Sequence, residues 1–132
     1  MKRLNLLFLL SVFTMGSLLA QNNANYEVLY FKANLACCQA KACDALQKDV
    51  AEVFESNFDS KDVSFTVVKL EDDAKQELID KYNAKSQTVV CVKSDDDKGK
   101  SVDLSPAIRQ YKDHKDKEKL VAQIKGEIVK LN

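Results

Sequence analysis

The chain of 132 residues lacks any excess of charge, because 20 Lys and Arg balance 20 Asp and Glu. A balanced chain gives no basis for binding nucleic acid or an anionic membrane surface. The chain has one His and no paired Cys-x-x-Cys motif, so the ligands of a structural zinc site are missing. It also contains no internal repeat and no low-complexity segment. We therefore expect one folded domain without a cofactor or a resident metal.

The first residues, Met1–Ala20, differ from the rest of the chain. Two basic residues precede a nearly continuous apolar run, and small residues follow up to Ala20. This pattern is typical of a secretory signal that is cleaved after Ala20. We expect an exported protein, periplasmic or secreted, with residues 21–25 as a short disordered lead and no membrane attachment after cleavage. An uncleaved membrane anchor is the alternative.

Four segments rich in β-branched and aromatic residues predict strands: Tyr26–Lys32, Val63–Leu70, Thr88–Val92 and Ser101–Leu104. A helical pattern separates the first two, and its apolar positions form one stripe that we expect to pack on the sheet: Leu46, Val50, Val53 and Phe54. A second helix is expected after Asp72, and a last one after a cap at Asp116. The stretch from Ser105 to Tyr111 is expected to be a connection.

A cluster of cysteines marks the joint between the first strand and the first helix. Cys37, Cys38 and Cys43 lie within seven residues, and Cys37 opens the helical pattern. The first N–H groups of a helix lack internal partners and favour an anion. A thiolate at Cys37 is such an anion, so we expect its pKa to lie below the ordinary value of about 8.5. The fourth cysteine, Cys91, lies in the third predicted strand. Cys43 and Cys91 both lie in apolar patterns, so each can also be interpreted as a buried small hydrophobe.

The order of the elements is strand, helix, strand, helix, two strands and helix. A helix joins the first two strands, which should therefore be parallel, and the last two should form an antiparallel hairpin. This order predicts an α/β fold with a central four-stranded mixed sheet flanked by helices. Over residues 26–132 the chain resembles the thioredoxin-like superfamily, and most closely the small exported bacterial ArsF-type thioredoxin-like proteins.

The resemblance implies thiol–disulfide chemistry with a partner protein, and Cys37 matches the nucleophilic cysteine of the family. The family's second cysteine would fall at position 40, where this chain has Ala40. The thiol that completes the exchange is left open between Cys38 and Cys43, with Cys91 as a third candidate. Gln87 stands about where the family has a cis-proline, and Phe31 stands where it has a buried acid.

These departures keep three functions open. The first is a thiol–disulfide oxidoreductase in which Cys37 attacks and Cys38 or Cys43 completes the exchange. The second is a redox-inactive binding or accessory module that kept the fold and lost the chemistry. The third is a protein that binds a thiophilic metal or metalloid through the thiolates of Cys37, Cys38 and Cys43.

Overall fold

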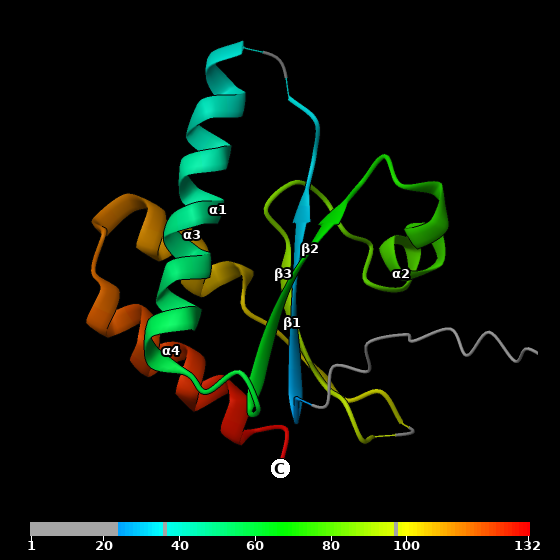
Figure 1. Ribbon diagram of the computed structural model, residues 1–132, viewed down its shortest axis with the longest axis vertical. Coiled ribbons are helices and arrows are strands. Elements are labelled where there is room, and N and C mark those ends of the chain that lie inside the picture. The colour runs from blue at the N-terminus through cyan, green and yellow to red at the C-terminus, as the bar shows by residue number, and fades with distance from the viewer. Residues whose placement is uncertain (1–23, 36, 97) are drawn as a thin grey trace, which may run out of the picture.

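A mixed sheet of four strands forms the centre of the computed structural model, which describes residues 24–35, 37–96 and 98–132, with only the backbone of Cys37. Its strands are, in chain order, β1 (Tyr26–Lys32), β2 (Val63–Lys69), β3 (Val89–Lys93) and β4 (Ser101–Asp103). They lie side by side in the order β2-β1-β3-β4 (Figure 1). Each strand overlaps its predicted segment, with the ends differing by at most one residue.

The directions of the strands follow the connections between them. β1 pairs in parallel with β2 along its whole length, from Tyr26 opposite Val63 to Lys32 opposite Lys69. β3 runs antiparallel to β1, and β4 runs antiparallel to β3. The parallel first pair and the antiparallel hairpin are both as predicted, because a long helical crossover leads to a parallel neighbour and a short turn to an antiparallel one.

In the described part of the chain, four helices flank the sheet, and they are distributed unequally over its two faces. The helices are α1 (Cys37–Asn57), α2 (Gln76–Lys81), α3 (Ser105–His114) and α4 (Lys117–Val129), with a short 3-10 turn, η1 (Asp73–Lys75), before α2. In Figure 1, α1, α3 and α4 lie on one side of the sheet and α2 lies on the other. The expected cap of the last helix is present, since Asp116 Oδ1 accepts a hydrogen bond from Lys119 N at 3.0 Å.

The helix α3 corrects the expectation of a connection from Ser105 to Tyr111. Pro106 lies in the first turn, where a missing N–H group costs little and the fixed φ favours a helix. Ile108 and Tyr111 stand three residues apart and are both buried, with 1% and 3% of their surface exposed. These two buried side chains form the apolar face of the helix. A helix of only ten residues has few apolar positions, so its helical period is hard to recognise in the sequence.

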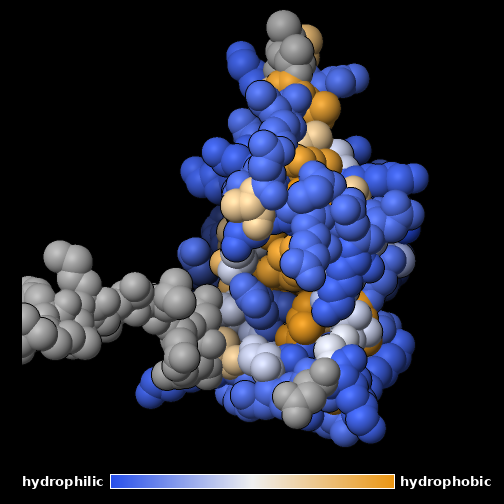
Figure 2. Space-filling view, turned by 90° about the vertical axis from the view of Figure 1, so that its right-hand side faces the viewer, coloured by the Kyte–Doolittle hydropathy of each residue, from blue (hydrophilic) through white to orange (hydrophobic). Residues whose placement is uncertain are grey.

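The core has one layer on each face of the sheet. On the larger face, the stripe of α1 packs with β1, β3, α3 and α4, and the four stripe residues Leu46, Val50, Val53 and Phe54 are buried as predicted. On the other face, a smaller cluster lies beneath α2: Leu29, Phe31, Val68, Ile79 and Val90. Because α2 is short, this second face is incompletely covered, and apolar atoms reach its surface in patches between polar side chains (Figure 2).

The folded body begins before the predicted domain boundary at Tyr26. Ala24 is 4% exposed, and Asn25 joins two segments by accepting from Ser94 N at 2.9 Å and donating to Lys61 O at 3.3 Å. These two residues, expected in the disordered lead, thus pack with the domain. The predicted signal, Met1–Ala20, lies outside the described residues. Within the described ranges, no helix is long and apolar enough to cross a membrane.

Candidate thiol site

The first two turns of α1 extend beyond the end of β1 (Figure 1). Cys38 is exposed and carries a free thiol, and among residues 38–57 of the helix the first fully buried side chain is that of Leu46. An ion pair fixes the helix just before that point, since Lys32 Nζ lies 2.5 Å from Asp44 Oδ1. The cysteines therefore lie on a part of α1 with little packing, which opens more readily than a core segment. Cys37 begins the helix, and its side chain lies outside the described residues.

Cys43 meets the loop that precedes β3. Its thiol is half-buried and free, and Gln87 Nε2 donates a hydrogen bond to Cys43 Sγ over 3.0 Å. Gln87 has a φ of 66°, a left-handed backbone that is uncommon outside glycine. Main-chain hydrogen bonds hold this loop to β1, because Gln87 N donates to Phe31 O at 2.9 Å and Phe31 N donates to Thr88 O at 2.8 Å. The pre-β3 loop thus places a fixed donor against a thiol of α1.

Two buried polar atoms lie in the same layer. Tyr30 is 1% exposed, and neither its hydroxyl nor Gln47 Oε1 has a hydrogen-bond partner among the described residues. Burial raises the pKa of Tyr30 to about 12, and the negative charge of a Cys43 thiolate contributes to this rise. Gln47 follows Cys43 by four residues, so the two side chains share one side of α1. Cys43 therefore lies in a partly polar environment rather than in a purely apolar core.

Phe31, which stands where the resembled family has a buried acid, faces away from α1, and the structure places a different residue on the face that α1 covers. Successive strand residues face opposite sides of a sheet. Phe31 belongs to the cluster beneath α2, whereas Tyr30 belongs to the layer beneath α1. The ionisable group near a cysteine of α1 is thus the phenol of Tyr30. Tyr30 could have been found from the sequence by the alternation of side chains along β1, since a residue next to Phe31 must face the opposite side of the sheet.

Cys91 is part of the core, as expected for a small hydrophobe in a strand. Its side chain is fully buried among the residues that pack under α1. Burial raises the pKa of the Cys91 thiol to about 12. A thiol that stays protonated is a poor nucleophile, because the thiolate is the attacking form. Cys91 is therefore unsuited to completing an exchange that begins on α1.

The structure brings no set of metal ligands together in the parts of the chain it describes. No group of three or more His, Cys, Asp or Glu side chains converges there. Cys38 is exposed while Cys43 turns toward the pre-β3 loop, so these two thiols have different surroundings. The side chain of Cys37 lies outside the described residues, and metal binding through all three thiolates stays a prediction.

Comparison with known proteins adds little to this geometry. No family model matches the chain, and no curated protein matches its sequence. A solved structure described as "Structure of a malarial protein" is similar to this chain, with 21% sequence identity and a TM-score of 0.48. The similarity covers 78% of this chain and 97% of that one. A similarity of this extent carries no argument about family or activity.

Proposed function

We propose that the protein is an exported thioredoxin-like protein that carries out thiol–disulfide exchange with a partner protein. Cys37 is the attacking thiol, and Cys43 is the second thiol. The observation that carries the proposal is the contact between Cys43 and Gln87, which sets a half-buried thiol of α1 against the loop before β3. The order of the strands and the position of Cys37 at the start of α1 support it.

The exchange takes two steps. The Cys37 thiolate attacks one sulfur of the partner's disulfide, forms a mixed disulfide and releases the first partner thiolate. The Cys43 thiolate then attacks the Cys37 sulfur, which forms a Cys37–Cys43 disulfide and releases the second partner thiolate. Two electrons pass to the partner, and its two thiolates take up protons. Run in reverse, the same steps oxidise a dithiol partner.

The second step requires the start of α1 to open. Cys43 follows Cys37 by six positions, which places the two residues about 9 Å apart along an ideal helix and about 240° around it. The described side chains between them are exposed or half-buried, and the ion pair at Asp44 lies just after this segment. Unwinding residues 37–42 therefore breaks few contacts. The adjacent Cys38 is a poorer second thiol, because a disulfide between neighbouring residues closes a strained ring.

Timed alkylation tests the assignment of Cys37. The reduced, folded protein is treated with iodoacetamide across a range of pH, and each cysteine is followed by peptide mapping. We expect Cys37 to react first because the helix terminus favours its thiolate, Cys38 second because it is exposed, Cys43 slowly, and Cys91 only after unfolding. Faster labelling of Cys43 or Cys91 than of Cys37 contradicts the proposed site.

Export is tested separately. N-terminal sequencing of the soluble protein, purified from the host's periplasm or medium, is expected to begin near Gln21, because the basic start and apolar run of Met1–Ala20 have the features of a cleaved signal. Recovery of Met1 from that soluble protein contradicts the prediction. The result is independent of the thiol assignment, since it concerns residues that carry none of the cysteines.

A further inference from the structure

The two outer strands of the sheet differ in how well they are protected from pairing. β4 has three residues, ends at Asp103 and follows Lys100, so it is short and charged. β2 has seven residues, of which the first six are uncharged, and it contains no proline. Natural proteins block an outer strand with charge, proline, a bulge or short length, because its free N–H and C=O groups can pair with another strand. β2 has none of these protections before Lys69.

The backbone groups of β2 alternate between the sheet and the outside. At its two ends, Asp62 O accepts from Tyr26 N at 2.9 Å and Leu70 N donates to Lys32 O at 2.9 Å. In a parallel pair, alternate residues bond to the neighbouring strand. The even-numbered residues of β2 therefore bond to β1. The N–H and C=O groups of Phe65 and Val67 point away from the sheet.

At each end of β2, one outward group is already used within the chain. Val63 N donates to Asp59 O at 2.9 Å, and Lys69 O accepts from Asp72 N at 3.1 Å. Among the described residues, the outward groups left without a partner are the C=O of Val63, both groups of Phe65, both groups of Val67 and the N–H of Lys69. This set has an equal number of donors and acceptors, and it is symmetric about Thr66.

We propose that β2 pairs with β2 of a second copy of this chain, antiparallel and centred on Thr66, to give a continuous sheet through a two-fold dimer. A two-fold axis makes such a pair antiparallel and self-complementary. In this register Phe65 lies opposite Val67 of the second copy, and each exchanges two hydrogen bonds with the other. Lys69 lies opposite Val63 of the second copy, and the N–H of Lys69 reaches that residue's free C=O.

The register is fixed by the groups that are already used. When the centre is Thr66, the occupied Val63 N–H faces the occupied Lys69 C=O, so neither needs a new partner. Moving the centre to Phe65 sets the occupied Val63 N–H against the free C=O of Val67 and leaves that C=O unpaired. Since a buried backbone group without a partner costs free energy, the register centred on Thr66 is favoured.

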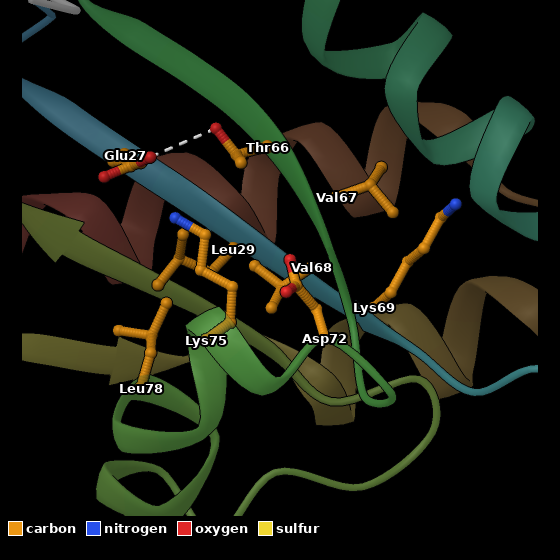
Figure 3. A pocket seen from close by; sticks show the side chains of 9 residues that line it. All are labelled: Glu27, Leu29, Thr66, Val67, Val68, Lys69, Asp72, Lys75 and Leu78. Carbon is orange, nitrogen blue, oxygen red and sulfur yellow. Dashed lines mark hydrogen bonds between the residues drawn. The ribbon is translucent and has the colours of Figure 1, made fainter. Parts of the chain in front are cut away.

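The side chains of β2 are compatible with the same arrangement. Thr66 faces the side of the sheet that carries α2, where it lines a pocket of about 410 Å³, and Figure 3 shows Val67 on the opposite side of β2. The Thr66 hydroxyl already donates to Glu27 Oε1 at 3.1 Å, so the two facing threonines contribute packing at the two-fold axis rather than a new hydrogen bond. At each end, Lys69 comes near the turn of the second copy that contains Asp59, Lys61 and Asp62. Both segments carry charges of both signs, because Glu71 and Asp72 follow Lys69, so the register rests on the backbone groups rather than on charge.

A cysteine placed at the two-fold axis tests the proposal. Thr66→Cys is expected to form a covalent dimer under mild oxidation, since facing residues at a non-hydrogen-bonded position have Cα atoms about 4.5 Å apart. Ser64→Cys, on the same strand and the same face, is the matched control. In this register, residue 64 of one copy and residue 64 of the other are four residues apart, about 14 Å along the strand. The Ser64→Cys variant is therefore expected to stay monomeric on a denaturing gel. Both variants carry Cys37→Ser and Cys38→Ser, so that the cysteines at the start of α1 do not cross-link.

Sedimentation of the unmodified protein gives a second readout. The expected mass rises from one chain to two with concentration, and Val67→Pro, which removes an outward N–H group without breaking a bond to β1, is expected to keep the mass at one chain. Equal cross-linking of the two cysteine variants, or a single-chain mass at every concentration, overturns the proposal. A single-chain mass is also the result expected if another segment of the chain or an unrelated peptide covers the edge of β2, and in that case too the dimer proposal is wrong. None of these outcomes depends on the thiol chemistry of α1.

Discussion

Replacing Cys37 by serine is expected to reduce disulfide exchange to the uncatalysed rate. The assay follows reduction of a disulfide-bonded peptide by the protein, with a small dithiol supplied to regenerate it. Serine has nearly the same size as cysteine but no thiolate, so the first attack on the partner's disulfide cannot occur. Cys91→Ala is the control, because Cys91 is fully buried and takes no part in either step. It is expected to keep the exchange rate.

The second thiol is identified by the species that accumulates. Cys43→Ser is expected to trap a mixed disulfide between Cys37 and the peptide, visible by intact mass, while Cys38→Ser is expected to keep full exchange. Trapping by Cys38→Ser instead assigns the second step to the neighbouring thiol. An exchange rate that Cys37→Ser leaves unchanged contradicts the redox proposal and favours a binding module that kept the fold alone.

The arrangement of the strands could be read from the sequence because each apolar segment is short and the connections differ in length. The long helical pattern after Lys32 required β1 and β2 to be parallel, and the short turn before Ser101 required a hairpin. The helix α3 was missed because its apolar face has few residues and only becomes apparent when Ile108 and Tyr111 are seen to be buried against the sheet.

The candidate site was harder to predict, because its members come from three separate segments. The sequence placed Cys37 at a helix start and Gln87 before the third strand, but not the contact between Gln87 and Cys43. That contact depends on how far α1 extends beyond β1, which is a matter of packing. Tyr30 was overlooked for a related reason. The resemblance drew attention to position 31, where the family has a buried acid, and the side chain of Phe31 faces the other side of the sheet.

Stability is expected to fall steeply between pH 9 and pH 12. Burial raises the pKa of Cys91 from 9.0 to about 12, and burial together with the Cys43 charge raises that of Tyr30 from 10.0 to about 12. In this range the folded protein holds both protons while the unfolded chain releases them. The contribution is therefore complete below pH 9 and is lost as the pH rises toward 12. A rise of one pKa unit corresponds to about 1.4 kcal/mol, so a rise of about three units for Cys91 and of about two for Tyr30 together amount to roughly 7 kcal/mol.

Denaturant unfolding at a series of pH values measures this loss, and two variants assign it. Cys91→Val fills a similar volume without an ionisable group and is expected to reduce the loss of unfolding free energy that begins near pH 9. Tyr30→Phe is expected to reduce the loss that begins near pH 10. Cys38→Ser is the matched control for removal of a thiol, because the Cys38 side chain is exposed and lies outside the core. If Cys91→Val declines as steeply as the parent protein, the Cys91 thiol is ionised in the folded state, and its burial in the core is contradicted.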